Sequence, residues 1–136
     1  MATNILLGDF LPGFYMGGYL LGADFNSTED QAIKILSPTR WYAVFRHYVI
    51  NPSTSLTTAQ GSLYLNAGKD VILNATTTGY TAAQTNAINT ANNAVGQAVS
   101  NNVVTDNDTI YLSLTTAQGA PATADVYVFI IPFWGT

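Results

Sequence analysis

The stretch RWYAVFRHYVI, residues 40–50, decides the class of fold that this sequence predicts. β-branched and aromatic side chains fill it, and these residues favour strands over helices. Asn51-Pro52 follows directly, and a proline restricts the backbone of the residue before it and ends regular strand pairing. We therefore expect a long β-strand over residues 40–50.

Further strands are expected on both sides of this one. In residues 109–114, apolar and polar residues alternate, which places Ile110, Leu112 and Leu114 on one face of a strand. The segment DVYVFIIPF is apolar on both faces, as in a central or an interface strand. The segment NAGK, residues 66–69, is a short glycine-containing turn that joins two strands. The remaining expected strands are residues 32–36, 62–65, 70–74 and 125–133.

One segment, residues 81–99, has the pattern of a helix. Ile88, Ala91, Val95 and Ala98 recur at intervals of three and four residues, and the segment opens with a Thr-x-x-Gln capping box. About six strands and one α-helix predict a mainly β protein. We expect an antiparallel β-sandwich or jelly-roll-like barrel, with the helix of about residues 81–99 covering an edge or one end.

The N-terminal residues do not fit this alternating pattern. Residues 5–25 are apolar and aromatic, but six Gly and Pro residues, Asp9 and Asp24 interrupt them, which excludes a membrane-spanning helix and argues against any long helix. We therefore expect an irregular, apolar, Gly-rich arm over residues 1–25 and a single β-sandwich domain over residues 26–136. The arm either packs along its own domain or docks on a neighbouring subunit.

The composition indicates a protein that lives in contact with other protein. Charged residues make up 9% of the 136 residues, against about 25% in ordinary soluble domains. Neutral polar side chains can re-pair across an interface, whereas a buried Lys or Glu needs a charged partner. Together with eight Tyr, six Phe and two Trp, this favours permanent assembly over an ordinary secreted β-domain.

The charge and the absence of cysteine narrow the function further. The net charge is −4 and the four Lys and Arg residues are scattered, so the sequence lacks the clustered cations that bind a phosphate backbone. We expect neither nucleic acid nor membrane as a partner. With no cysteine, stability cannot come from disulfides or thiolate metal sites.

The sequence also offers little that suggests catalysis. His47 is the single histidine, and it lies in the middle of an expected strand, so a sheet-face position is the default. Asp106 and Asp108 resemble half of a calcium loop, but neither the glycine nor the distal glutamate follows, so a strand-entry turn is expected. Glu29 and Asp30 are adjacent, which points them apart in an extended chain. Phosphate-loop, HExxH and CxxC motifs are absent, and we expect no enzyme, cofactor or metal site.

The aromatic residues carry more information than the titratable ones. They crowd the arm and two of the expected strands, where core packing and subunit contact are their usual roles. The alternative is a platform of exposed Trp and Tyr that binds carbohydrate. The residues expected at interfaces are Phe10, Phe14, Tyr15, Tyr19, Phe25, Trp41, Phe129 and Trp134.

The heptapeptide SLTTAQG occurs twice, at residues 55–61 and 113–119. The flanking sequences correspond only weakly, which argues against a duplicated fold. Leu anchors a strand end, the Thr hydroxyls bond to nearby backbone and Gly permits a turn. We expect both copies to connect strands near sheet ends, an arrangement that allows them to lie side by side.

The order of these segments resembles a known family. The second SLTTAQG copy is followed by an Ala/Thr linker and the strand ADVYVF of residues 124–129, while NPSTSLTTA, a Gly-Ser-Leu-Tyr strand and the helical segment lie upstream. Over roughly residues 40–133 this resembles the head decoration (cement) proteins of tailed bacteriophages. The resemblance implies a non-enzymatic virion protein that forms a homotrimer on the capsid surface, bridges neighbouring capsomers of the major capsid protein lattice and stabilises the shell. It identifies no individual residue.

Two other functions remain open. A glycan- or receptor-binding module of a phage fibre would expose Trp41 or Trp134 beside an unpaired Asp or Asn. Another extracellular structural subunit, of a tail tube or a pilus, would form helical polymers in place of closed trimers.

Overall fold

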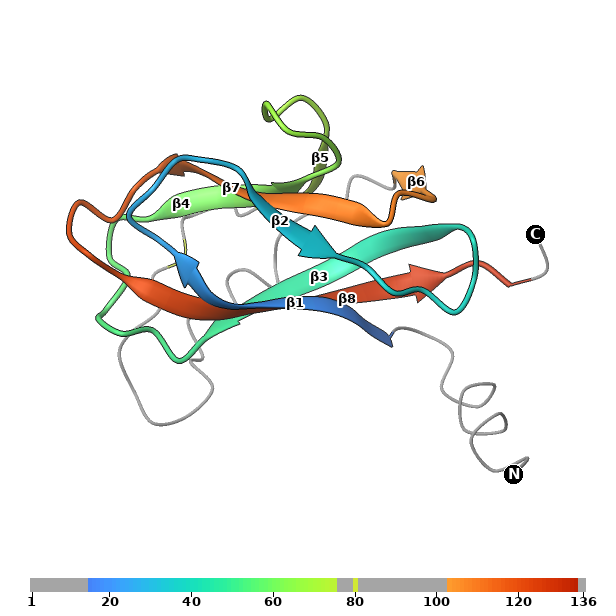
Figure 1. The fold of residues 1–136 in the computed structure, drawn as a ribbon, viewed down its shortest axis with the longest axis horizontal. Coiled ribbons are helices and arrows are strands. Elements are labelled where there is room, and N and C mark those ends of the chain that lie inside the picture. The colour runs from blue at the N-terminus through green and yellow to red at the C-terminus, as the bar shows by residue number, and fades with distance from the viewer. Residues whose placement is uncertain (1–14, 76–79, 81–102, 135–136) are drawn as a thin grey trace.

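The computed structural model of the chain describes residues 15–75, 80 and 103–134, and in them the chain forms eight β-strands and no helix. The strands make two four-stranded antiparallel sheets that lie face to face (Figure 1). The expectation of a mainly β, antiparallel fold is therefore confirmed. The helix expected at residues 81–99 lies outside the described residues.

Each sheet contains strands from both halves of the chain. Sheet A has the order β1 (Tyr15–Asp24), β8 (Thr123–Pro132), β3 (Tyr42–Ile50) and β6 (Val104–Thr105). Sheet B has the order β2 (Gln31–Lys34), β7 (Thr109–Thr116), β4 (Gln60–Tyr64) and β5 (Ile72–Ala75). The first strand thus pairs with the last, the second with the seventh, the third with the sixth and the fourth with the fifth.

The core lies between the two sheets and follows from the period-two alternation of their strands. Along β8, Ala124, Val126, Val128 and Ile130 are buried, while the residues between them are partly exposed. The predicted alternation of residues 109–114 is also confirmed, because Ile110, Leu112 and Leu114 of β7 are fully buried.

The N-terminal segment is where the structure departs from expectation. Residues 15–24 are the edge strand β1, paired with β8, so the expectation of an irregular arm is wrong from residue 15 onward and the described domain begins before residue 26. The glycines that argued against regular structure allow close packing instead. A Cβ on Gly17 would lie 2.8 Å from Ile130 Cδ1, and one on Gly18 would lie 2.6 Å from the Lys34 carbonyl oxygen. Residues 1–14 lie outside the description.

The two SLTTAQG copies meet at one end of sheet B, as expected. The first copy leads into β4 and the second ends β7, and Gln60 pairs with Thr116 where these strands are neighbours. The Gln118 side chain joins the copies directly. Its Oε1 accepts from the backbone N–H groups of Thr58 at 3.0 Å and Ala59 at 3.1 Å, and its Nε2 donates to Thr57 Oγ1 at 3.1 Å.

Candidate assembly surface

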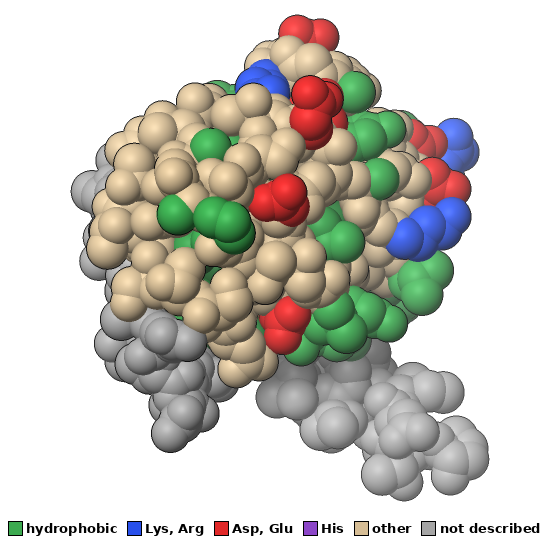
Figure 2. Space-filling view, turned by 60° about the vertical axis from the view of Figure 1, so that its left-hand side comes forward, with side chains coloured by type: hydrophobic (Ala, Val, Ile, Leu, Met, Phe, Trp, Pro, Cys, Tyr) green, Lys and Arg blue, Asp and Glu red, His purple; other side chains and the backbone are tan. Residues whose placement is uncertain are grey.

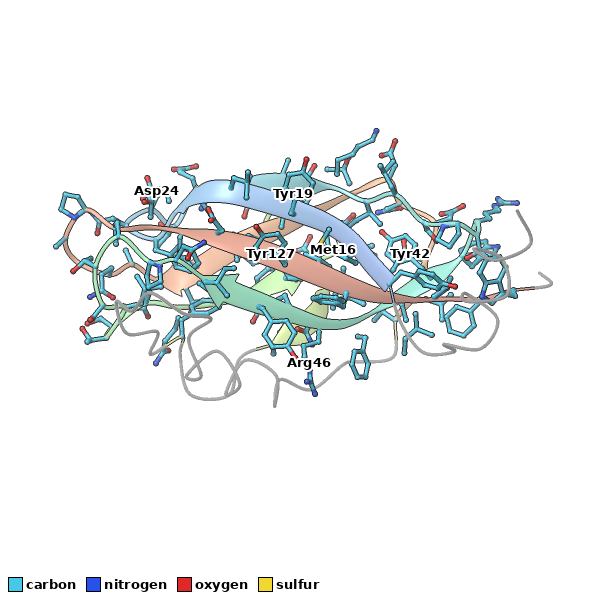
Figure 3. The ribbon with its side chains drawn as sticks, turned by 90° about the horizontal axis from the view of Figure 1, so that it is seen from below. Met16, Tyr19, Asp24, Tyr42, Arg46 and Tyr127 are labelled. Carbon is cyan, nitrogen blue, oxygen red and sulfur yellow. The ribbon has the colours of Figure 1, made fainter. Side chains whose placement is uncertain are left out.

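The outer face of sheet A is lined with aromatic and apolar side chains from three strands. The register brings Met16 and Arg46 to either side of Phe129, and Tyr19 and Tyr48 to either side of Tyr127. Figure 3 shows Met16, Tyr127 and Arg46 on β1, β8 and β3 in the view from below. We call this surface the aromatic face. It comprises Met16, Tyr19, Arg46, Tyr48, Ile50, Asp125, Tyr127 and Phe129.

The rings of the aromatic face contact one another and leave a shallow groove between them. Tyr48 meets Phe129 edge to face with ring centroids 5.6 Å apart, and Tyr19 lies 6.4 Å from Tyr127. The groove has a volume of about 440 Å³, and its walls are Met16, Tyr48, Ile50, Tyr127 and Phe129. Met16 is 51% exposed and Tyr19 56%, so a large apolar area is open to solvent here.

Arg46 lies beside this groove and carries the positive charge at one end of the aromatic face. Its Nη1 donates to the Tyr48 hydroxyl at 2.8 Å, and its guanidinium carbon lies 5.1 Å from the centre of the Phe45 ring and 5.8 Å from that of Tyr48. Its Nε is buried without a hydrogen-bond partner. Stacking on aromatic rings pre-orders a guanidinium, which then has donors left for an incoming acceptor.

Asp125 carries the opposite charge at the other end of the aromatic face. Its carboxylate accepts from the Gly22 N–H at 2.9 Å and from Asn51 Nδ2 at 3.2 Å. Both donors are neutral, and among the described residues Asp125 has no ion-pair partner. Asn51 itself has φ of 52° at the end of β3, where an asparagine tolerates the left-handed conformation.

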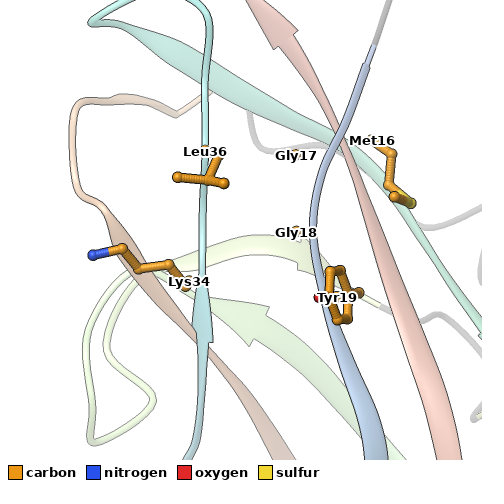
Figure 4. A pocket seen from close by; sticks show the side chains of 6 residues that line it. All are labelled: Met16, Gly17, Gly18, Tyr19, Lys34 and Leu36. Atoms are coloured by element: carbon orange, nitrogen blue, oxygen red, sulfur yellow. The ribbon is translucent and has the colours of Figure 1, made fainter.

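A second hollow lies where β1 passes the end of β2, and we call it the edge pocket (Figure 4). It has a volume of about 420 Å³ and is lined by Met16, Gly17, Gly18, Tyr19, Lys34 and Leu36. The Leu36 N–H donates to the Gly17 carbonyl at 2.8 Å, which ties the two segments together. The Leu36 side chain is 75% exposed, although it is apolar and large.

The free edge of β1 is protected against the addition of another strand. The hydrogen bond between Leu36 and Gly17 covers one end of this edge. At the other end the Gln31 carboxamide pairs with the backbone of Asp24. The Asp24 N–H donates to Gln31 Oε1, and Gln31 Nε2 donates to the Asp24 carbonyl, each at 2.8 Å. Register shifts interrupt the strand between these points. Bulges and covered backbone groups are the usual means of preventing edge-to-edge pairing, so side-chain surfaces are the better candidates for contact.

The aromatic residues expected at interfaces have different positions. Tyr19 and Phe129 lie on the aromatic face, and Tyr15 meets Trp134 edge to face with centroids 6.4 Å apart. Trp134 is 61% exposed. Trp41 is partly buried, with the Arg40 guanidinium 5.1 Å from the centre of its ring.

Phe25 was expected at an interface, and the structure places it in the core. Its side chain is fully buried and meets Tyr80 edge to face with centroids 5.1 Å apart, so it belongs to the core of the domain. It was expected outside because the preceding glycines suggested an arm. Phe10 and Phe14 lie outside the described residues.

His47 lies inside the sandwich as part of a buried polar cluster. Its Nδ1 is 2.6 Å from Asn74 Oδ1 and its Nε2 is 3.2 Å from the Tyr80 hydroxyl. An amide oxygen accepts, so the neutral ring donates from Nδ1 and accepts at Nε2. Burial lowers the pKa of His47 to about 4, against a smaller opposing effect of the Asn74 hydrogen bond, and burial raises the pKa of Tyr80. The cluster is closed to solvent and links the two sheets, which is a structural role.

The acidic residues weighed as calcium or catalytic groups are engaged in pairs and turns. Asp106 pairs with Arg40 at 3.3 Å and Asp108 with Lys34 at 3.2 Å, at the turn that connects β6 and β7. The expectation of a strand-entry turn is thus confirmed. Asp30 accepts from the buried Ser113 hydroxyl and from the Gly68 N–H, and these bonds hold the pKa of its carboxyl below the usual value.

Sequence reasoning missed several residues of these surfaces. The spacing of Arg46, Tyr48 and Ile50 at every second position was a signal for one common face of β3. Met16 and Leu36 had no such signal, because two glycines follow Met16 and Leu36 lies after the end of β2. Within the described ranges, no three His, Cys, Asp or Glu residues are grouped so as to hold a metal ion. No helix there is long and apolar enough to cross a membrane.

The surface away from these hollows is poor in charge. Figure 2 shows that neutral polar side chains and backbone cover most of one side of the molecule, with hydrophobic side chains gathered towards its right-hand edge. Such a surface costs little to desolvate, as the composition predicts. Comparison of the chain with protein-family models, with curated proteins and with solved structures found no match.

Proposed function

We propose that this protein is a non-enzymatic structural subunit that associates with itself and with a larger protein lattice. The specific proposal is a decoration protein on the capsid surface of a tailed bacteriophage. The observation that carries it is the distribution of exposed apolar side chains. Among the described residues, Met16, Tyr19 and Leu21 of β1 and the neighbouring Leu36 are all more than half exposed. Contiguous exposed apolar surface of this kind marks interaction sites.

The strand order supports a jelly-roll assignment. In both sheets, strands from the two halves of the chain alternate, and the pairing of first with last and second with seventh corresponds to a rolled-up long hairpin. Eight-stranded jelly rolls occur in viral capsid proteins and in lectins. The architecture by itself fits both groups of proteins, so the site has to decide between them.

The chemistry of the site favours protein contact. The groove of the aromatic face has apolar and aromatic walls, and the hydroxyl of Tyr48 already accepts from Arg46. A sugar placed there would have to replace the hydration of most of its hydroxyl groups, whereas an apolar side chain has no hydrogen bonds to replace. The edge pocket, with Leu36 and Tyr19 at its rim, is a second and adjacent apolar surface. A protein that bridges capsomers needs two surfaces, one for its own copies and one for the lattice.

We assign the lattice contact to the edge pocket, and substitution of Leu36 tests it. Leu36→Asp places a charge on a 75% exposed side chain that packs on nothing in the core, so the domain should still fold. Val104→Asp is the matched control, because Val104 is 48% exposed on the opposite edge strand of sheet A. Cosedimentation with empty heads, followed by electron microscopy, should show that the Leu36 variant fails to decorate capsids while the Val104 variant decorates them.

Three other results would contradict the proposal. Normal decoration by the Leu36 variant would show that the lattice contact lies elsewhere. If the unsubstituted protein forms helical polymers, a tail-tube or pilus subunit becomes the better assignment. Absence of binding to heads would exclude a decoration protein. Truncations should stop at residue 14, since removal of residues 1–25 would delete β1 and unfold sheet A.

One observation favours a glycan-binding module as second candidate. Trp134 is 61% exposed beside Tyr15, and exposed tryptophans are the usual platforms for sugar rings. A glycan array tests this, with Trp134→Ala as the variant that must lose any signal. An array without hits would leave the structural role.

A further inference from the structure

Among the described residues, the distribution of charged pairs leaves one cation without a carboxylate. The sequence contains four Lys and Arg residues, all of them in the described part. Lys34, Arg40 and Lys69 pair with Asp108, Asp106 and Asp30 at 3.2 to 3.6 Å. Within the described ranges, Arg46 donates one side-chain hydrogen bond, to the neutral Tyr48 hydroxyl, and no carboxylate is paired with it. In a chain with so few charges, this cation stands on the aromatic face.

The same face carries a carboxylate that no described cation pairs with. Arg46 is opposite Phe129 in the register and Asp125 is opposite Ile50, so the two charges stand at opposite ends of the face. Four residues of extended chain separate the levels of Arg46 and Ile50, which is roughly 13 Å. Tyr48 and Tyr127 pair midway between them. The face therefore runs from a positive end through an aromatic middle to a negative end.

We propose that the aromatic face binds the same face of a second copy of this chain. A two-fold axis in the plane of the interface, crossing the strands at the Tyr48–Tyr127 pair, reverses one face relative to the other. Each Arg46 then lies over the partner copy's negative end, and the two aromatic middles meet. A contact of this kind is isologous, since residue 46 meets residue 125 and residue 125 meets residue 46.

This occupant fits better than the alternatives. The edge of β1 is closed to strand addition by Leu36 and Gln31, so a second copy must approach through side chains. Tyrosines near the centre of an apolar patch, as Tyr48 and Tyr127 are here, belong to the residues that most often dominate binding energies, and so does arginine. The three strands are about 30 Å long, and the face that they span is smaller than the standard interface of about 800 Å² per partner. The dimer should therefore dissociate on dilution. The inference rests on the proposed function in requiring self-association, and it specifies a two-fold dimer in place of the trimer that the family resemblance implies.

Charge reversal gives a test that only this geometry satisfies. Sedimentation equilibrium over a wide concentration range should show a monomer–dimer equilibrium for the unsubstituted protein. Arg46→Asp alone and Asp125→Arg alone each place like charges at both symmetric contacts, so each should weaken dimerisation at least about tenfold. An equimolar mixture of the two variants restores both contacts in the heterodimer, and the double variant restores them in the homodimer. Recovery of dimers in both cases is the expected result.

A variant off the face serves as control. Arg40→Asp reverses a 73% exposed cation that lines neither the groove nor the edge pocket, and it should leave the dimer unchanged. Asp125 also holds Gly22 and Asn51, so thermal unfolding of each variant must show a folded protein before its mass is interpreted. If the Asp125 variant does not fold, Tyr127→Glu is tested in its place, and loss of dimers by that variant is then the required result.

The inference is overturned by a monomer at every concentration, by dimers that tolerate both reversals, or by a mixture of the two variants that stays monomeric. A closed trimer indifferent to these substitutions would also overturn it, while the assembly role and the Leu36 test would stand. Conversely, charge-dependent dimers that ignore capsids would retain the inference and refute the decoration role.

Discussion

Acid should destabilise this protein through its single histidine, His47, as the pH falls below 6.5. His47 is fully buried between the sheets, and its pKa falls to about 4 from the usual 6.5 because burial disfavours the charged ring. The unfolded chain therefore binds a proton between these two values that the folded chain does not bind. Stability is highest above pH 6.5 and is lost as the pH falls towards about 4.

The size of the effect follows from the two pKa values. Integration of the proton-binding difference from pH 8 to pH 5 gives a loss of about 2 kcal/mol of unfolding free energy. This is a large share of a typical stability of about 5–15 kcal/mol. Asp30 and Asp108 have lowered pKa values, so their contributions are lost at more acidic pH than this window. The interval from pH 8 to pH 5 thus reports mainly on His47.

Two measurements check the prediction. Urea unfolding at several pH values should show the loss, and His47→Gln, which cannot titrate, should abolish the pH dependence over this interval. Because the chain has one histidine, NMR titration of its ring gives the folded pKa directly and does not need the variant to fold. A ring that titrates near 6.5 in the folded protein, or an unfolding free energy that is flat between pH 8 and pH 5, would refute the reasoning.

Two further predictions concern glycines of the repeated heptapeptides and Asp30, which accepts a hydrogen bond from Ser113 of the second copy. Gly61→Ala should lower the free energy of unfolding by about 3 kcal/mol, since the new Cβ would lie 2.5 Å from the Ser113 carbonyl oxygen. Gly119→Ala, in open space at φ of 90°, should lower it by about 1 kcal/mol. Thermal unfolding of the two variants measures both losses, and equal losses would contradict the packing argument. Asp30→Asn should weaken the charge-assisted hydrogen bonds from the Ser113 hydroxyl and the Gly68 N–H, and so destabilise the protein by about 1 kcal/mol at pH 7. In strong acid the stabilities of the variant and the unsubstituted protein should become equal. Chemical unfolding at pH 7 and in strong acid checks both expectations.

The strands whose faces alternate were predictable from the sequence. β7 and β8 bury every second residue over most of their lengths, and β3 carries the β-branched and aromatic residues typical of a strand. β1 was not predictable by the same rule, because Gly17 and Gly18 lack the side chains from which alternation is recognised. Their absence is required by Ile130 and the Lys34 carbonyl, which only the folded structure brings near.

The candidate site was predictable in its residue types but not in its arrangement. Phe129 and Tyr19 were expected at interfaces because aromatic residues dominate contact energies. That Arg46 has no carboxylate partner in the described part of the chain cannot be inferred from a sequence, since pairing depends on which strands become neighbours. The same holds for His47, whose partners Asn74 and Tyr80 follow 27 and 33 residues later.

The position of β8 has a consequence for the order in which the protein forms during synthesis. β8 lies between β1 and β3 and pairs with both along their lengths (Figure 1). Until residue 132 has left the ribosome, β1 and β3 have been made but share no ladder, because each lacks the strand that it pairs with along its length. Nascent chains in this state expose strand edges to one another, so we expect aggregation on crowded polysomes and among truncated products.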